Sequence, residues 1–313
     1  MKKFIVKNEN VGKRLDVFLQ ENNKEFSRSY IKTLTQENKV LLNGIVPKKS
    51  GEKLKLNDEI VLQDIELQIP STEPENLPLD IVFQDSCLAV INKAQGMVVH
   101  AGNGNFSGTL VNALLYHIKD LSGINGVLRA GIVHRLDKNT SGLLLVAKND
   151  NAHRLLAKQI EEKTCVRKYV AILDGNVAND SGRIETLISR NPKNRTLMTT
   201  HVQDGKSAIT EYQVLERFEK HCLVEFSLKT GRTHQIRVHC KEVLNHSITG
   251  DREYGGLPAK NLAKRDSISQ GQYLHAYKIS FKHPQTNKEM TFKTECPEYF
   301  KKLLTHLRQN EKI

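Results

Sequence analysis

The 313-residue sequence contains no apolar stretch that approaches the roughly 20 residues needed to span a membrane. Tryptophan is absent and aromatic residues are few, so the apolar content is mainly aliphatic. The first residues, MKKFIVKNEN, soon turn polar, which is not typical of a signal peptide. The sequence shows neither an internal repeat nor a low-complexity tract. These absences exclude membrane and repeat proteins, and we expect a cytoplasmic protein that has no membrane partner.

Cysteine is also scarce. The five cysteines stand at positions 87, 165, 222, 240 and 296, and none forms a CxxC pair. An odd and scattered set in a chain of this length is typical of reduced cytosolic thiols. We therefore expect no structural zinc site.

Basic residues, in contrast, are in excess. The chain has 47 Lys and Arg against 35 Asp and Glu, a formal net charge of +12. Such a balance favours an anionic partner, most commonly nucleic acid. A generic basic cytosolic protein is the alternative. The length indicates two domains, or one large domain with a small module.

Residues 11–62 read as a compact module. Helical spacing occurs in VGKRLDVFLQ and SRSYIKTL, a hairpin is expected around Asn43-Gly44, and LKLNDEIVL closes with a strand. This order, with its interleaved basic residues, resembles the S4 RNA-binding domain; the alternative is a small α+β module with a solvated basic face. We predict an S4-like domain over residues 1–68, with RNA contacts by Arg14, Arg28, Lys32, Lys48 and Lys49.

A linker and a larger domain follow. The stretch IPSTEPENLP, residues 69–78, has three prolines and little apolar content, which is typical of a linker. From residue 79 to residue 313, many short apolar runs alternate with a few helical patterns such as NAHRLLAKQIEE. We expect an α+β domain built on a mixed, mainly antiparallel sheet flanked by helices.

The stretch HRLDKNTSG, residues 134–142, places His134, Arg135 and Asp137 within four positions, between the apolar runs AGIV and LLLVA. AGIVHRL is expected to be a strand and DKNTSG a turn, followed by a buried strand. Asp137 then lies in a loop at a strand end, where catalytic groups are often held. The alternative is a structural turn in which Asp137 or Asn139 binds backbone amides.

A second cluster is KTGRTHQIRVHCKEVL, residues 229–244. Apolar spacing predicts a helix, with Arg232, His234, Arg237 and His239 near its start, where an anion is favoured. His234 and His239 are five residues apart and do not share a helix face, which disfavours a metal site. A metal-dependent hydrolase that uses these histidines with His134 and Asp137 remains the alternative.

Two further segments carry polar groups within apolar patterns. Tyr169 stands in the strand pattern RKYVAILDG, where it could equally be a core residue, and Lys93 and His100 flank a glycine turn in INKAQGMVVHAG. Together with GIVHRLDKNTSGLLLVAK, LKTGRTHQIRVH, GDREYGG and LHAYKISFKHP, these segments resemble, in order, the motifs of the RluA-type pseudouridine synthases. The segments PLDIVF, GTLVNALL and ISRNPKNRT resemble the D-type subgroup. Ala94 and Ala101 stand where the family usually has proline.

The resemblance implies a role for several residues. Asp137 would be the essential aspartate, nucleophile or base, acting on a flipped-out uridine, and Arg237 would pair with it. Arg135 would hold the RNA and the site vacated by the base, and Tyr169 would contact the uracil. Arg232 and His234 are further expected RNA contacts.

The resemblance also implies a pseudouridine synthase fold over residues 79–313 and a large-subunit ribosomal RNA substrate, with a D-type target in a stem-loop. The reaction needs no cofactor and no metal, and we expect a monomer. Two alternatives are a non-catalytic RNA-binding factor of ribosome assembly and a synthase that acts on another ribosomal or transfer RNA site.

Overall fold

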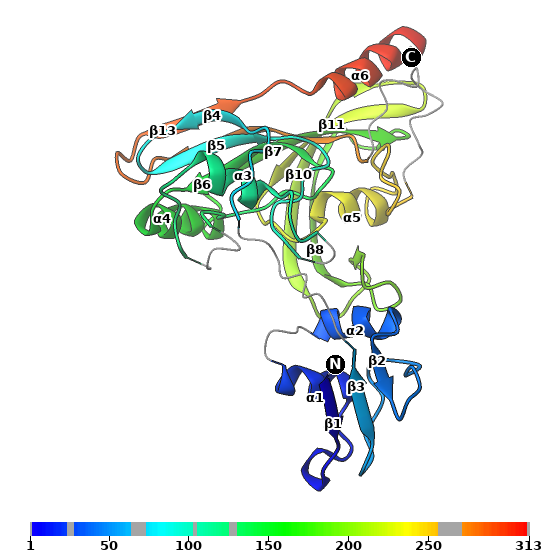
Figure 1. Ribbon diagram of the computed structural model, residues 1–313. Coiled ribbons are helices and arrows are strands. Elements are labelled where there is room, and N and C mark those ends of the chain that lie inside the picture. The colour runs from blue at the N-terminus through cyan, green and yellow to red at the C-terminus, as the bar shows by residue number, and fades with distance from the viewer. Residues whose placement is uncertain are drawn as a thin grey trace. The chain divides into compact units, whose positions relative to one another are not determined.

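The computed structural model describes residues 2–23, 28–63, 73–102, 105–124, 130–255 and 271–311, without the side chains of residues 28–30 and 33. The chain divides into two compact units, one of residues 1–70 with 102–106 and one of residues 71–101 with 107–313 (Figure 1). No helix within the described ranges is both long enough and apolar enough to cross a membrane.

The N-terminal unit is a three-stranded antiparallel sheet covered by two helices. Its elements are β1 (Lys2–Ile5), η1 (Asn8–Asn10), α1 (Leu15–Asn22), α2 (Arg28–Gln36), β2 (Val40–Leu42) and β3 (Glu59–Leu62), with strand order β1-β3-β2. Helical spacing brings Leu15, Phe18 and Leu19 of α1 to one face, where they pack with Ile31 and Leu34 of α2. The two helices predicted here are therefore present.

The hairpin predicted around Asn43-Gly44 is only partly correct. Both residues have positive φ angles, 51° and 78°, which suit a tight hairpin turn, and Leu42 bridges Ile45 across it. The run after the turn does not form a strand, since Ile45 is 73% exposed and Pro47 has no backbone N–H to donate. Strand β2 pairs instead with β3.

The second unit contains a mixed sheet of ten strands in the order β4-β5-β6-β12-β7-β11-β10-β8-β9, with β13 paired to β12. The strands are β4 (Asp80–Gln84), β5 (Leu88–Lys93), β6 (Ser141–Ala147), β7 (Val166–Asp174), β8 (Ser181–Arg190), β9 (Met198–Thr199), β10 (Lys206–Arg217), β11 (His221–Leu228), β12 (Leu274–Lys282) and β13 (Glu289–Lys293). All pairings of these strands are antiparallel except β6 with β12. The expected α+β class is confirmed.

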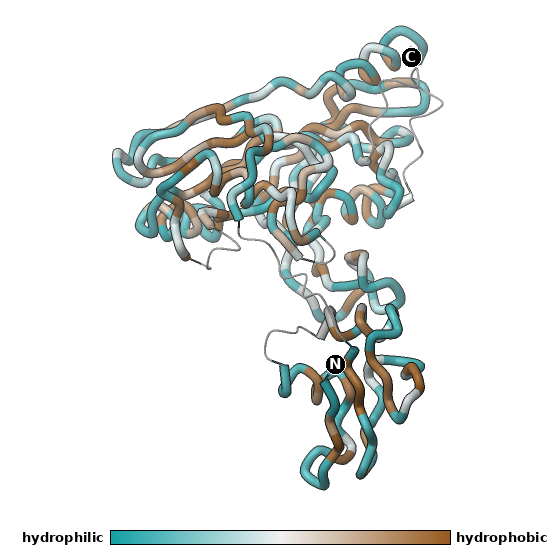
Figure 2. Tube along the Cα trace, viewed as in Figure 1, coloured by the Kyte–Doolittle hydropathy of each residue, from teal (hydrophilic) through white to brown (hydrophobic). Residues whose placement is uncertain are grey.

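Helices cover both faces of this sheet. They are α3 (Leu110–His117), α4 (Asp150–Glu161), α5 (Gln235–Glu242) and α6 (Glu298–Asn310). Strand side chains alternate between faces, so one set packs with α3 and α5 while the other packs with α4 and α6. The hydropathy trace in Figure 2 is accordingly brown along the central strands and mixed along the helices.

Strand β6 follows the loop that carries Asp137, and all seven of its residues are buried. Its glycine, Gly142, has φ +112°, and a Cβ there would lie 2.3 Å from the carbonyl oxygen of Ala276 on β12. Only glycine therefore permits the close approach of β6 to β12 immediately after this loop.

The predicted strand AGIVHRL is wrong. Residues 130–136 are irregular and make one isolated bridge, between Ile132 and Val146. The segment lies beside the end of β6, where the Gly131 carbonyl accepts from the Ala147 N–H. The N–H of Leu145 on β6 binds the His134 side chain and not a backbone carbonyl, so no ladder forms.

Part of the predicted linker is hydrogen-bonded within the second unit. The backbone N–H of Glu75 donates to the Asn112 carbonyl, and the Asn112 side chain donates to the Glu73 carbonyl. The Glu75 carboxylate accepts from the N–H of Gly108, just before α3. Residues 73–78 thus run along the start of α3, whereas residues 69–72 of the predicted linker lie outside the described ranges.

Candidate active site

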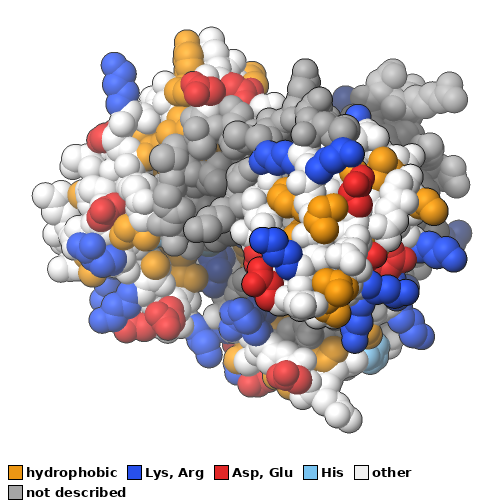
Figure 3. All heavy atoms as spheres, turned by 60° about the horizontal axis from the view of Figure 1, so that its bottom comes forward, with side chains coloured by type: hydrophobic (Ala, Val, Ile, Leu, Met, Phe, Trp, Pro, Cys, Tyr) orange, Lys and Arg blue, Asp and Glu red, His pale blue; other side chains and the backbone are white. Residues whose placement is uncertain are grey.

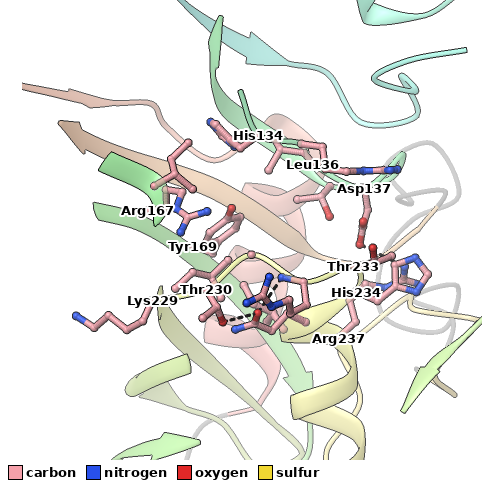
Figure 4. A pocket seen from close by; sticks show the side chains of 18 of the residues that line it. His134, Leu136, Asp137, Arg167, Tyr169, Lys229, Thr230, Thr233, His234 and Arg237 are labelled. Carbon is pink, nitrogen blue, oxygen red and sulfur yellow. Dashed lines mark hydrogen bonds and ion pairs between the residues drawn. The ribbon is translucent and has the colours of Figure 1, made fainter. Parts of the chain in front are cut away.

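A pocket of about 460 Å³ opens in the second unit, a volume typical of small-ligand sites. The loop before β6, strand β7 and the segment from the end of β11 into α5 line it (Figure 4). These segments are far apart in the sequence. The lining includes every site residue that the sequence predicts for this unit: Arg135, Asp137, Tyr169, Arg232, His234 and Arg237.

Asp137 lies in a loop that is anchored on both sides. Leu136 is buried in the core, and the N–H of Thr140 donates to the Asp137 carbonyl to close a turn. The Thr140 hydroxyl accepts a hydrogen bond from the buried Gln272 side chain. The Asp137 carboxylate faces the pocket with 18% of its side chain exposed. The turn is therefore closed by the backbone carbonyl of Asp137 and not, as in the structural alternative, by its side chain, which faces the pocket.

Lys93 holds the same loop through hydrogen bonds to backbone carbonyls. Its buried ammonium donates to the carbonyls of Ala94, Met97 and Lys138, at 2.8, 2.9 and 3.1 Å. Burial lowers the pKa of Lys93 to about 7, while the charge of Asp137 opposes that shift. Lys93 stood out in the sequence as a flank of a glycine turn, but nothing there indicated that it would bind the residue after Asp137.

Arg237 contacts Asp137, although its geometry differs from the expected pair. Its Nη1 lies 3.4 Å from one Asp137 oxygen, whereas Nε and Nη2 bind both oxygens of Asp251 at 2.6 and 2.8 Å. Nη2 also binds Glu253, and the guanidinium carbon lies 4.9 Å from the centre of the Tyr254 ring. Arg237 therefore forms its bidentate ion pair with Asp251 and not with Asp137.

The surroundings keep Arg237 charged. Burial by itself lowers the pKa of Arg237, but the hydrogen bond and charge of Asp251 and the charge of Asp137 raise it above its ordinary value. The segment GDREYGG contributes to the family resemblance, but the sequence pattern indicates no role for its acidic residues. Acidic residues beside glycines were the available signal, and only the fold shows that they hold Arg237.

Tyr169 is buried on β7, two residues after Arg167 and therefore on the same face of the sheet. Its ring packs in the main core cluster, and it also lines the pocket beside Asp137 (Figure 4). Burial raises the pKa of Tyr169 to about 12. Tyr169 is therefore a core residue that also lines the pocket, and its contact with uracil stays a prediction.

The segment before α5 is positioned by Gln235. Its side-chain oxygen accepts from the Thr230 hydroxyl and the Arg232 N–H, and its NH₂ group donates to the Ile209 carbonyl and the Thr210 hydroxyl. Because this buried amide has partners on both sides, it joins the loop of residues 230–235 to β10.

His234 begins α5 in the left-handed region, with φ 55°, which is uncommon for a residue other than glycine. Its Nδ1 lies 3.0 Å from the Tyr254 hydroxyl, which also accepts the N–H of Met198. Arg232 is half-buried and donates through Nε to the Ser207 carbonyl. Both residues therefore hold the pocket wall as well as line it.

The three histidines of the hydrolase alternative have separate partners. His134 Nε2 accepts the N–H of Leu145, while His234 bonds to Tyr254. His239 lies between the hydroxyls of Thr186 and Thr210. Among the described residues, the group that could hold a metal ion is elsewhere, at Asp85, Cys87 and His283. The arrangement does not fit the hydrolase.

The basic residues predicted to contact RNA in the N-terminal unit differ in whether an acidic side chain binds them. The exposed guanidinium of Arg14 forms a two-nitrogen pair with Asp16, at 3.0 and 2.9 Å. Lys32, Lys48 and Lys49 are exposed, whereas the Arg28 side chain lies outside the described residues.

Comparison with known proteins identifies the family. The pattern of the RNA pseudouridylate synthase family matches residues 87–242. An uncharacterised RNA pseudouridine synthase of Bacillus subtilis is 42% identical over 302 residues, 96% of either chain. Ribosomal large subunit pseudouridine synthase D of Neisseria meningitidis is 43% identical over 95% of this chain and 79% of its own length. The solved human protein RNA pseudouridylate synthase domain containing 4 has a TM-score of 0.57 and 25% identity, over 73% of this chain and 93% of that one. The chain therefore belongs to the RNA pseudouridine synthase family.

Proposed function

We propose that this protein isomerises uridine to pseudouridine in large-subunit ribosomal RNA, at a stem-loop target of the D type. Relatives named ribosomal large subunit pseudouridine synthase D, similar over nearly the whole chain, support that choice of substrate. The names of these relatives also support the proposal that this chain has the isomerase activity of the D enzymes. Action on another ribosomal or transfer RNA site is the alternative substrate.

In this proposal a uridine leaves its stack and enters the pocket, which is least unfavourable in an RNA loop. Tyr169 offers an aromatic surface for the uracil. Asp137, acting as nucleophile or base, assists the breaking of the N1–C1′ bond. The base then turns and C5 bonds to C1′, while the C5 proton is lost and N1 gains one. Arg135, exposed at the rim, would contact the RNA around the vacated position.

The observation that carries this assignment is the single available carboxylate beside a buried arginine. Asp251 and Glu253 are both bound to Arg237, and Glu161, the other acidic residue of the described lining, is exposed at the end of α4. A glycoside hydrolase needs two carboxylates, one of which activates water. One carboxylate in a cationic pocket suits an isomerase, which must keep water from its intermediate.

We also propose that the N-terminal unit, as an S4-like domain, contributes RNA affinity through Arg14, Arg28, Lys32, Lys48 and Lys49. Phosphate contacts supply most of the affinity and little of the sequence choice. On the face in Figure 3, lysine and arginine side chains recur over the surface with acidic side chains among them. The expectations of a cofactor-free, metal-free, cytoplasmic monomer are part of the same proposal.

The test is Asp137→Asn, which keeps the size of the side chain and removes its charge. If Asp137 reacts, tritium release from C5-labelled uridine in a ribosomal RNA fragment should fall by at least about 1000-fold. RNA affinity and the melting temperature should remain, because phosphate contacts lie elsewhere. If Asp137 only shapes a turn, asparagine should serve nearly as well. Near-normal tritium release would refute the assignment.

A further inference from the structure

Arg167 is a buried cation in the pocket wall that the mechanism above does not use. It stands at the start of β7, lines the pocket, and is 4% exposed. Its Nη1 lies under the loop before α5, so that a Cβ on Gly231 would be 3.0 Å from it. In the sequence, Arg167 is the first residue of the pattern RKYVAILDG, and nothing there indicates a role for it.

Two of the three guanidinium nitrogens of Arg167 lack an acceptor among the described residues. Within the described part of the chain, Nε and Nη2 of Arg167 are buried and have no hydrogen-bond partner. A buried charge without a partner is strongly unfavourable. The other buried arginine of the pocket, Arg237, binds three carboxylates. Among the described residues, this contrast leaves two N–H groups of Arg167 available to a ligand in the pocket.

The position of Arg167 relative to the reactive residue narrows the choice of partner. In Figure 4, Tyr169 lies between Arg167 on one side and Asp137 on the other. Burial is the main cause of the raised pKa of Tyr169, but both charges also act on it, since Arg167 lowers that pKa and Asp137 raises it. A group that contacts Tyr169 can therefore have one end at Asp137 and its opposite end at Arg167.

A uracil has that form. Its N1 is bonded to C1′, which must lie near Asp137, and C4 is the ring atom opposite N1. The carbonyl oxygen on C4 then projects away from the sugar, past Tyr169. We propose that Arg167 donates to O4 of the flipped uracil and thereby selects uridine over cytidine.

The selection follows from the donors and acceptors. Arginine has five N–H donors and no acceptor. It can therefore bind the O4 of uracil but only repels the N4 amino group of cytosine. A site built to hydrogen-bond one substrate group discriminates strongly against an analogue that lacks it, because its own polar group is then left unpaired. The inference rests on the proposed function, since it requires a uridine in the pocket.

The experiment compares RNA fragments whose target is uridine or 4-thiouridine, in which sulfur, a weak acceptor, replaces O4. For wild-type protein, kcat/KM for tritium release should be about 10-fold to 100-fold lower with 4-thiouridine, the range for one charged hydrogen bond. With Arg167→Met, activity on uridine should fall to a similar level and the ratio between the two substrates should approach one. Because this ratio compares two substrates with one preparation, partial unfolding of a variant does not change it.

Lys168→Met is the matched control. Lys168 is the next residue on β7, points to the opposite face, and pairs with Glu225 at 2.6 Å. The Lys168→Met variant should keep the wild-type ratio between uridine and 4-thiouridine. With wild-type protein, a 2-thiouridine substrate, which retains O4, should react about as well as uridine. Arg167→Lys, which still donates, should retain part of the discrimination.

Two results would overturn the inference alone: equal wild-type activity on uridine and 4-thiouridine, or an unchanged ratio in Arg167→Met. A wild-type protein that releases no tritium from uridine in any ribosomal RNA would instead overturn the proposed function, and this inference with it. A competitor RNA with cytidine at the target should bind wild-type protein more weakly than the uridine RNA, and this difference should vanish in Arg167→Met.

Discussion

Arg237 and Asp251 form a two-nitrogen ion pair in which both side chains are buried, with N–O distances of 2.6 and 2.8 Å. The pair sets the direction of the guanidinium, and the remaining nitrogen, Nη1, points to Asp137. Asp251 therefore acts on Asp137 through Arg237, as a positioning residue.

Asp251→Asn tests this relationship. One charged oxygen of a buried pair is replaced by an amide donor that faces the guanidinium, so stability should fall by about 3 kcal/mol. Activity of the folded protein should fall by about 100-fold, as a misplaced catalytic group is costly. Melting and tritium release measure the two effects.

The control is Glu253→Gln, since the Glu253 side chain also binds Arg237 but is 50% exposed. Exposed pairs contribute up to about 1 kcal/mol, so this variant should remain close to wild type. Equal losses in the two variants would contradict a special role for Asp251.

Substitutions at Tyr169 separate its ring from its hydroxyl. Tyr169→Phe retains the aromatic surface and should keep kcat/KM within about 10-fold, the range of one hydrogen bond. Tyr169→Leu removes the surface on which the base is proposed to stack. That stacking is worth about 1 to 3 kcal/mol, so the substitution should lower kcat/KM by a further factor of about 5 to 150. If leucine and phenylalanine act alike, stacking on Tyr169 does not contribute.

His134 should make the protein sensitive to acid. Burial, followed by the charge of Arg167, lowers the pKa of His134 to about 3, and its Nε2 accepts the Leu145 N–H. Between the ordinary value of 6.5 and about 3, the unfolded chain binds a proton that the folded protein does not. Stability therefore falls with falling pH through this window, by up to about 1.4 kcal/mol per pH unit from this residue.

His134→Gln does not titrate and keeps an acceptor on its side chain. Urea unfolding of wild type and variant at pH 6.5 and pH 4.5 isolates the contribution, since all other groups titrate in both proteins. The wild type should lose more stability over this interval. An identical loss would show that His134 takes up a proton without disturbing the fold.

Lys48 and Lys49 test the proposed RNA surface of the N-terminal unit. The double variant Lys48→Gln, Lys49→Gln should bind the RNA fragment more weakly, and the slope of log K against log salt should fall by about 0.7 for each phosphate that the protein no longer neutralises. The control replaces exposed Lys288 and Lys302, which lie outside the pocket lining, and should leave the slope unchanged. Equal slopes in wild type and Lys48/Lys49 variant would assign the module another partner.

Sequence alone determined the α+β class, most of the strands of the second unit and the helices of the first, because these depend on apolar spacing along a continuous segment. It also identified Asp137, Tyr169 and Arg237 as candidates, from unusual polar groups within apolar patterns and from the family resemblance. The segment 130–136 looked like a strand by the same spacing, but it makes only one bridge to β6, because the Leu145 N–H binds the His134 side chain instead of a backbone carbonyl.

Tertiary structure alone decided how these residues are held. Asp251 takes the fork of Arg237, Lys93 braces the loop of Asp137, and Arg167 is buried beside the pocket with two nitrogens that have no partner among the described residues. Each of these relations joins segments that lie apart in the chain or depends on which atoms are already bonded. The pattern of residues along one segment does not indicate which distant segments will meet or which atoms will be bonded. Such hydrogen bonds depend on how the sheet packs between the segments.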